Sequence, residues 1–422
     1  MTRRLRVCTA GGIGLAVLLA GCSSKAEGES QGASGGGGIK TDVGVSDEAI
    51  TIGVLTDLSG PFKVSGLAMT AGNEMWASDA NESGGICGRE VVLDIKDAGY
   101  KPENALAIFE SQKSSVLGYA QLVGSHIIAA LKTKIAADSI FTIAAATSSM
   151  NMDDPAVQVL SATNDIEIIN GLAYMQQSGQ LNDGDKIAHV YLDSEFGQNS
   201  VQGSAYYAQQ HDLSVIEIPV GATDTDMTAV ITKVKSEGAS LIVLSTAGAG
   251  AGSVVLQNAA QGLNLPIIAN SSSFTPSSLS DPAMVEAMKN VSFASGWAPV
   301  GSDGELAQKI QDEYTQKYDD PTSFALNAGY VYGLTWQAVL EKACELGDLT
   351  REGVLKAKEE VTELDTDGLT GVFDLSDYRV PTTRETFIVA ADPSAIEWGG
   401  WSIVEDLFVS DEAKSYKAPH QG

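Results

Sequence analysis

A strand-then-helix rhythm repeats along most of the chain and limits its fold more than any other feature of the sequence. The first unit is the β-rich run AITIGVL at 49–55, followed by a turn with glycine and proline and a helical pattern at about 65–82. The later strands of this series are expected at 90–97, 119–124 and 140–146. Because strands joined through helices pair in parallel, the series predicts a parallel sheet with helices on both faces.

A second series with the same rhythm begins near Thr163. Its strands are expected at 186–192, 213–220, 240–246 and 265–270, with helical patterns between them. Two series imply two α/β lobes, and the helical and short β patterns that follow residue 300 indicate that the chain crosses between the lobes again. Three connections are expected, at 161–164, 295–299 and 362–370.

These connections predict the division of the chain. The N-terminal lobe is expected to comprise residues 48–161 and 297–361. The C-terminal lobe is expected to comprise residues 162–296 and 362–410.

The first residues of the chain are typical of export. Three arginines precede an apolar stretch that ends in Leu-Ala-Gly-Cys at 19–22, so a signal peptide is expected at 1–21. A small residue before a cysteine resembles the bacterial lipobox, in which Cys22 is acylated and tethers the protein to the membrane. An ordinary secretory signal with an incidental cysteine is the alternative. Residues 22–41, rich in Ser, Gly and Glu, predict a lipidated flexible linker.

The chain is strongly acidic, with a formal net charge of −28. Removal of residues 1–21 takes away three arginines and no acid, which leaves 23 basic and 54 acidic residues and a charge of −31. This charge argues against nucleic acid as a partner. It would also repel an anionic membrane surface, so the lipid on Cys22 is expected to hold the protein at the outer face of the cytoplasmic membrane.

Two cysteines, Cys87 and Cys344, remain after export and acylation of Cys22. An even number of cysteines in an oxidising compartment favours a disulfide, and we predict that these two pair. Two separate buried thiols are the alternative, because spacing alone does not bring the two residues together.

Several weak motifs occur in an order that resembles a known family. They are TIGVLTDLSGPFKVSG at 51–66, GGICGREVVLDIKDAGYKPENA at 84–105, HVYLDSEFGQNS at 189–200 and NAGYVYGLTWQAV at 327–339. Together they resemble the type I periplasmic binding proteins of the branched-chain amino acid (Leu/Ile/Val-binding) ABC transporter family. The resemblance implies two Rossmann-like lobes joined by a three-strand hinge, a ligand in the cleft, and delivery to ABC permease and ATPase subunits.

Ligands of open α/β sheets bind beyond the carboxyl ends of the strands, where turns and helix starts expose N–H groups. In the first lobe the expected ligand-binding residues are Ser65, Ser125, His126, Ile128, Ala145, Thr147 and Ser148. In the second lobe and the hinge they are Phe196, Gly248, Ser271 and Trp297.

The resemblance gives roles to some of these positions. In branched-chain amino acid binders a serine and a threonine hold the carboxylate and ammonium groups of the ligand; Thr147 matches the threonine, but Ile128 stands at the serine position. Phe196 stands where the family has an aromatic residue that covers the ligand. Gly248 falls near a ligand-facing tyrosine, and Ser271 near the acid that pairs with the α-ammonium group.

The loss of that acid argues against a strict α-amino acid ligand, because an unpaired buried ammonium group costs several kcal/mol. Asp57, Asp193 or Glu195 could take over its role. No arginine lies in a predicted cleft turn, which argues against an arginine clamp on a carboxylate. The expected ligand is amino acid-like, an amide, or a relatively apolar carboxylate held by N–H and hydroxyl groups.

Some aromatic residues near the expected cleft have a purely structural alternative. Phe62 and Tyr100 are expected to pack structurally. His126 is equally well explained as an exposed turn residue, and Trp297 either braces the hinge or forms a wall of the cleft.

The sequence has few features of an enzyme. Its four histidines are scattered, and no metal-ligand cluster or nucleophile elbow appears, so neither catalysis nor a metal or other cofactor is expected. The expected function is that of an extracytoplasmic, lipid-anchored substrate-binding protein of an ABC importer. The alternative is a lipoprotein sensor that signals to a membrane partner without transport.

Overall fold

The computed structural model describes residues 38–274, 276–319 and 322–421. The expected signal peptide at 1–21, the expected lipidation site Cys22 and most of the linker at 22–41 lie outside these residues. Within the described residues, no helix combines the length and the apolar character that a membrane span requires.

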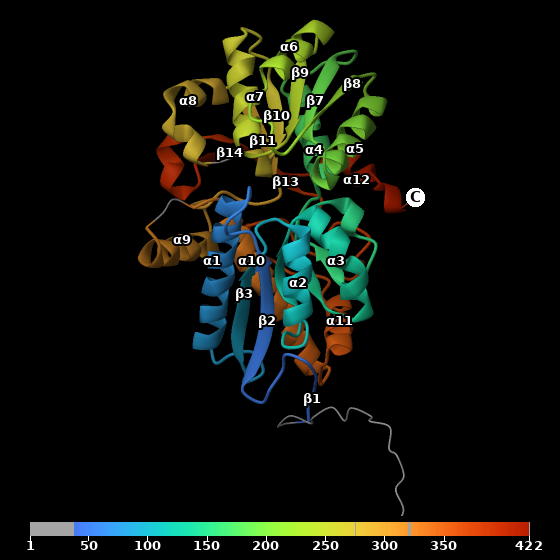
Figure 1. Cartoon of the computed structure of the whole chain (residues 1–422), viewed down its shortest axis with the longest axis vertical. Coiled ribbons are helices and arrows are strands. Elements are labelled where there is room, and N and C mark those ends of the chain that lie inside the picture. The colour runs from blue at the N-terminus through green and yellow to red at the C-terminus, as the bar shows by residue number, and fades with distance from the viewer. Residues whose placement is uncertain (1–37, 275, 320–321, 422) are drawn as a thin grey trace, which may run out of the picture. The chain divides into compact units, whose positions relative to one another are not determined.

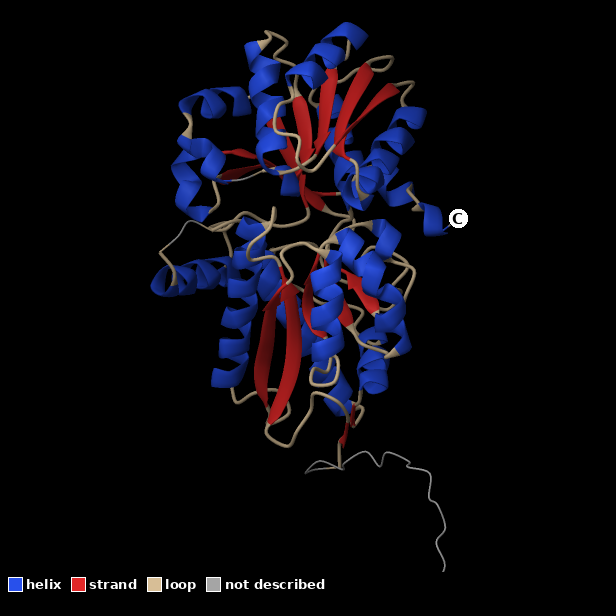
Figure 2. Ribbon diagram, in the orientation of Figure 1, coloured by secondary structure: helices blue, strands red, loops and turns tan. Residues whose placement is uncertain are grey.

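The first lobe is built on a five-stranded parallel sheet with the order β3-β2-β4-β5-β6 (Figures 1 and 2). Its strands are β2 (Ala49–Thr56), β3 (Glu90–Asp97), β4 (Tyr119–Val123), β5 (Thr142–Ala145) and β6 (Val157–Val159). Its main helices are α1 (Lys63–Glu82), α2 (Pro102–Gln112), α3 (Ser125–Ala137), α10 (Ala325–Glu345) and α11 (Arg351–Glu359).

Both faces of this sheet are covered, as the strand pattern predicts. Successive residues of a strand point to opposite faces. Ile50, Ile52 and Val54 of β2 are therefore buried against α1 and α10, whereas Leu55 is buried in a separate cluster with α2 and α3. The first of these clusters also contains residues between 297 and 375, so the first lobe is completed by residues that follow most of the second lobe in the sequence.

The second lobe has a seven-stranded sheet with the order β14-β13-β11-β10-β9-β7-β8. Its strands are β7 (Lys186–Leu192), β8 (Ser214–Val220), β9 (Leu241–Ser245), β10 (Ile267–Asn270), β11 (Val291–Ser295), β13 (Thr386–Ala391) and β14 (Trp401–Phe408). The helices α4 (Asn164–Gln177) and α5 (Glu195–Gln210) cover one face. The other face is covered by α6 (Thr228–Glu237), α7 (Gly248–Ala260) and α8 (Pro282–Met288).

Shorter elements complete the chain. They are β1 (Lys40–Thr41), which pairs with β12 (Asp348–Leu349), the helices α9 (Glu305–Lys317) and α12 (Asp411–Ser415), and the 3-10 turns η1 (Ser149–Asn151), η2 (Ser271–Ser273), η3 (Pro276–Ser280), η4 (Pro393–Trp398) and η5 (Pro419–Gln421). The predicted α/β class with two mostly parallel sheets is confirmed; the pairing of β13 with β11 and β14 is antiparallel.

The three crossings between the lobes meet at Ser161. Its hydroxyl donates to the carbonyl of Gly296 (3.0 Å), and its N–H donates to the hydroxyl of Thr382 (2.9 Å). The third crossing therefore lies near residue 382, and the expected position at 362–370, with the lobe boundary at 362, is wrong. Leu369 and Phe373 are fully buried in the core of the first lobe, which keeps this segment there.

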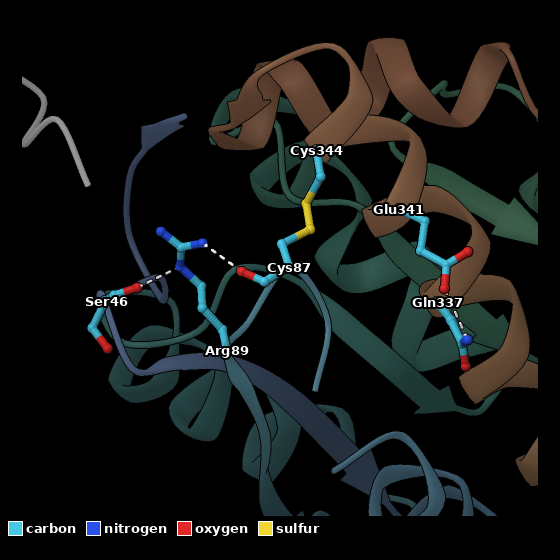
Figure 3. Close-up of a disulfide and its surroundings, with 6 residues drawn as sticks. All are labelled: Ser46, Cys87, Arg89, Gln337, Glu341 and Cys344. Carbon is cyan, nitrogen blue, oxygen red and sulfur yellow. Dashed lines mark hydrogen bonds between the residues drawn. A yellow bond between two sulfur atoms is a disulfide. The ribbon is translucent and has the colours of Figure 1, made fainter. Parts of the chain in front are cut away.

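The predicted disulfide between Cys87 and Cys344 is confirmed, with the two Cα atoms 6.5 Å apart (Figure 3). Cys87 lies between α1 and β3, and Cys344 lies in the last turn of α10. Arg89 supports the turn, because its guanidinium donates to the carbonyls of Ser46 (2.7 Å) and Cys87 (3.2 Å). The bridge joins positions 257 residues apart and holds the far ends of α1 and α10 together.

Loss of this bridge should destabilise the protein. The double variant Cys87→Ser, Cys344→Ser should lose about 2–5 kcal/mol of unfolding free energy, because a long loop is no longer closed in the unfolded chain. Urea unfolding measures the loss. As a control, a reducing agent should lower the midpoint of the wild type and leave that of the variant unchanged; equal midpoints for the two oxidised proteins would contradict the prediction.

Candidate ligand-binding site

A cavity with about 740 Å³ of empty space, part of it open to solvent, lies at the carboxyl ends of the first-lobe strands. The first lobe lines it with Phe62, Ser65, Met69, Tyr100, Val123, Gly124, Ser125, Ala145, Ala146, Thr147, Phe324, Ala325, Ala328 and Tyr332. The hinge and the second lobe contribute Asn164, Phe196, Ser271, Ser272 and Trp297. The cavity thus has the place that ligands take in open α/β sheets.

Seven of the eleven expected ligand-binding residues line this cavity. They are Ser65, Ser125, Ala145, Thr147, Phe196, Ser271 and Trp297. They come from both lobes and from the hinge, which are far apart in the sequence. The fold therefore brings most of the predicted set together.

Two residues of the first turn of α3 do not line the cavity. Ile128 is fully buried in the core between α3 and the sheet. The ring of His126 packs against the ring of Tyr100, with centroids 4.4 Å apart, and its Nε2 lies 3.3 Å from the Tyr100 carbonyl oxygen. Burial lowers the pKa of His126, so this side chain acts as a neutral support for Tyr100.

Ser148 and Gly248 do not line the cavity either. Ser148 begins the turn η1: its hydroxyl accepts from the N–H of Met150 (3.3 Å) and lies 3.5 Å from a carboxylate oxygen of Glu195. Gly248 begins α7 and borders a separate hollow of the second lobe.

Phe62 and Tyr100, which were expected to pack structurally, line the cavity with their rings 4.7 Å apart. The buried carboxylate of Asp57 sets the position of Phe62. It accepts the N–H groups of Gly60 (2.5 Å) and Phe62 (2.9 Å), which folds the loop after β2 around it. An aspartate at the end of a strand, two residues before a Ser-Gly-Pro turn, is the signal that could have predicted this arrangement.

The start of α10 was also missed as part of the site. Phe324, Ala325, Ala328 and Tyr332 line the cavity, although they follow the second lobe in the sequence. Their spacing places them on one face of the helix. Sequence patterns identify such a face, but they do not show which cavity it meets.

Among the residues that the structure describes, none that lines the cavity carries a charged side chain. Instead, α3, α4, α5 and α10 all begin at the cavity, and within the described residues the N-cap side chain makes no hydrogen bond to any of these four starts. At α4, however, the Asn164 N–H donates to the Thr147 carbonyl and the Ile166 N–H donates to the Asp165 carboxylate. Helix starts carry partial positive charge and N–H groups without intrahelical partners. The cavity is therefore an uncharged, largely apolar space with N–H donors at its edge, which suits an anionic group on an apolar molecule.

Asn164 and Thr147 form a polar corner where the two lobes meet. The Thr147 hydroxyl donates to Oδ1 of Asn164 (2.9 Å), and the Asn164 N–H donates to the Thr147 carbonyl (2.8 Å). This arrangement fixes the amide so that its Nδ2 remains available as a donor. The neighbouring Ser125, also on the cavity wall, adds a hydroxyl.

Glu167 lies buried behind the cavity wall. Its carboxylate accepts hydrogen bonds from the Ser271 hydroxyl (3.2 Å), the Asn270 amide (2.8 Å) and the Gly296 N–H (3.3 Å). Burial raises the pKa of Glu167 to about 7, although these hydrogen bonds oppose the shift. The carboxylate thus links a cavity residue, Ser271, to the hinge at Gly296.

Two lobes joined by three crossings, with an apolar cavity between them, define a hinged solute-binding protein. Residues 49–394 match a family model described as periplasmic binding protein. The chain belongs to this family, the type I periplasmic binding proteins of ABC transporters, which bind solutes outside the cytoplasm. Among curated proteins, none matches the chain by sequence.

The solved structures that are similar to this chain include the following three. A fatty acid ABC transporter substrate-binding protein from Thermomonospora curvata has a TM-score of 0.88 and 33% identity, over 92% of this chain and 99% of that one. A branched chain amino acid ABC transporter from Thermus thermophilus with bound valine has a TM-score of 0.76 and 18% identity, over 87% and 98%. A solute-binding protein from R. palustris in complex with benzoate has a TM-score of 0.69 and 19% identity, over 86% and 98%. At such identities, the last two show the shared fold alone.

The raised pKa of Glu167 predicts how stability depends on pH. Between the ordinary value of 4.5 and about 7, the folded state holds more protons at this site than the unfolded chain. The free energy of unfolding should therefore fall as pH rises through this interval, by about 3 kcal/mol in total.

The variant Glu167→Gln isolates this effect. Burial lowers the pKa of His189 to about 3, so this residue makes the free energy of unfolding rise with pH in the acid range. It does so equally in the wild type and in Glu167→Gln, and the difference between the two proteins removes its contribution. Urea unfolding at pH 5, 6, 7 and 8 should show the wild type losing stability relative to the variant. The exposed Glu237→Gln is the control, and parallel curves for the wild type and Glu167→Gln would contradict the prediction.

Proposed function

We propose that this protein is the substrate-binding subunit of an ABC importer and that its ligand is a carboxylate with an apolar body, such as a fatty acid. The observation that carries the proposal is the cavity itself, whose walls are mainly apolar and uncharged and whose edge holds the starts of α3, α5 and α10, none of which has a hydrogen bond from its N-cap side chain. A carboxylate would accept hydrogen bonds from N–H groups there, from the Ser125 hydroxyl and from the Asn164 amide.

An α-amino acid fits this cavity less well because its ammonium group needs an anionic partner. The three acids that could replace the family acid do not line the cavity. Asp57 holds its own loop, Glu195 lies beside Ser148, and Asp193 lies 3.5 Å from the side chain of Gln198. Glu167 is separated from the cavity by Ser271, to which it is bonded.

The relative from Thermomonospora curvata supports the same ligand class, since its name describes a fatty acid transporter and it shares 33% identity with almost the whole chain. An apolar molecule with one carboxylate is the chemistry that the cavity and this relative both favour.

Capture occurs by hinge closure in this proposal. Ser125 of the first lobe and the Asn164 amide hold the carboxylate, Thr147 orients that amide, and Phe196 and Ser271 of the second lobe cover the ligand. The lobes, taken as 48–161 with 297–381 and 162–296 with 382–410, turn about the crossings that meet at Ser161. The ligand binds the closed form more tightly, so it shifts the population towards the form that the permease receives.

A ligand series tests the proposal. Octanoate should raise the melting temperature more than octanamide or leucine, because only octanoate combines a carboxylate with an apolar chain and no ammonium group. At saturation it should also reduce the radius of gyration in small-angle scattering. A larger shift with leucine, or an equal shift with octanamide, would show that the ligand class is wrong; an unchanged radius would argue against closure.

The variant Ser125→Ala should bind octanoate about tenfold to hundredfold more weakly, since a hydrogen bond to a charged group contributes about 1.5–3 kcal/mol. Its affinity for the neutral octanamide should change less. Isothermal titration calorimetry measures both, with the exposed Ser236→Ala as the matched control. Unchanged octanoate affinity would remove Ser125 from the carboxylate site.

The proposal includes a lipid anchor at Cys22, placed by the sequence at the outer face of the cytoplasmic membrane. The full-length protein expressed in a bacterium should be recovered with membranes, and mass spectrometry should find acyl chains on Cys22. The variant Cys22→Ser should lose this modification. An unmodified Cys22 at the end of an exported, soluble chain would favour the ordinary secretory signal.

A further inference from the structure

The cavity has two unlike ends. The polar end consists of Ser125, Thr147 and Asn164, where α3 and α4 begin and the lobes are hydrogen-bonded to each other. The apolar end consists of Met69, Trp297, Ala325, Ala328 and Tyr332, which surround the starts of α1 and α10. Such a division gives an amphiphilic ligand one preferred direction.

The apolar end extends into the first lobe along two helices. Both α1 and α10 begin beside the cavity, and the disulfide joins their far ends, so they run in the same direction. Residues three or four apart lie on one face of a helix. Ala328 therefore lines the cavity one helical turn after Ala325, and Tyr332 lines it one turn further from the start of α10. On α1, Met69 lies one turn after Ser65.

Close contact between the two helices closes this end. A Cβ atom added at Gly329 would lie 2.0 Å from the Met69 carbonyl oxygen, and one added at Gly72 would lie 2.3 Å from the carbonyl oxygen of Leu326. The ring of Tyr332 packs against Trp297, with centroids 5.7 Å apart. Because the two helix backbones are in contact, no ligand passes between them. The apolar end of the cavity is therefore bounded by the Met69 and Tyr332 side chains, and the small side chain of Ala328 leaves room there.

We propose that the apolar end takes the hydrocarbon chain of the ligand, with the carboxylate at the polar end, and that Ala328 and Met69 set the longest chain that binds. This inference rests on the proposed function. Each methylene group buried there should strengthen binding about fourfold. Once the end is full, a further carbon must displace Met69 or Tyr332, and overpacking a buried site opposes binding.

A series of straight-chain acids from propanoate to dodecanoate, titrated by calorimetry, tests this inference. Affinity for the wild type should rise with chain length to a break point and then fall. Ala328→Leu adds three carbon atoms to the wall, so the break point should come about three carbons earlier and the best wild-type acid should bind about 60-fold more weakly. The shortest acids should bind both proteins equally.

Met69→Ala provides the opposite change, because it removes the end wall and should move the break point to longer acids. Ala338→Leu, at a half-buried position of α10 away from the cavity, is the matched control and should follow the wild type. If Ala328→Leu fails to fold, seen as loss of a cooperative melting transition, the Met69→Ala shift decides the question.

The outcomes separate this inference from the proposed function. Binding of no straight-chain acid to the folded wild type would overturn the proposed ligand class. Binding that strengthens with chain length, with a break point that neither variant moves, would leave the ligand class standing and show that the chain lies elsewhere. Break points that move in opposite directions in the two variants would support the inference.

Discussion

Parallel pairing of strands is the constraint on which the rest of this structure depends. It places the carboxyl ends of the strands at one edge of the first sheet, so the segments that follow β2, β4 and β5 gather at one place. The helices that begin in these segments direct N–H groups to the same place. The cavity therefore receives its electrostatic character from the backbone, and its walls can remain free of charged side chains.

This role of the backbone is compatible with the anionic ligand that we propose for so acidic a protein. The nearest buried carboxylates are already bonded: Asp57 to its loop, Glu167 to Ser271 and the hinge, and Asp165 to Ser149 (2.6 Å) and Tyr416 (3.0 Å). Their hydrogen bonds stabilise the turns and crossings that shape the cavity. The remaining acids are mostly at the surface, where salt screens them over about 8–10 Å.

Patterns within short stretches of the sequence were sufficient to predict the secondary-structure order and the number of lobes. The alternating strands and helices, the two lobes and the Cys87–Cys344 pair followed from periodicity, turn residues and cysteine count. The third crossing was misplaced because Leu369 and Phe373 lie in a segment without a regular period, and only the packed core shows which lobe buries them. The strand β14 was missed for a similar reason, since it is an edge strand with four consecutive exposed residues.

For the site, the turns after the strands were predictable, whereas the walls depended on tertiary packing. Ser125 and Thr147 follow strands of a recognisable series, but Ala328 and Tyr332 reach the cavity only because α10 returns to the first lobe and packs on α1. Ile128 differs from these residues: family correspondence pointed to the cleft, whereas its place on α3 buries it in the core.

The Cys87–Cys344 bridge gives the cavity wall a dependence on redox compartment. The disulfide links α10 to the segment that follows α1, at the end remote from the cleft. Nearer to the cleft, the two helices are in close contact at Gly72 and Gly329. In a reducing compartment the Cys87–Cys344 disulfide is absent, and α1 and α10 are held together by packing alone. Oxidation after export would thus make the wall of the cavity rigid only where the protein meets its solute.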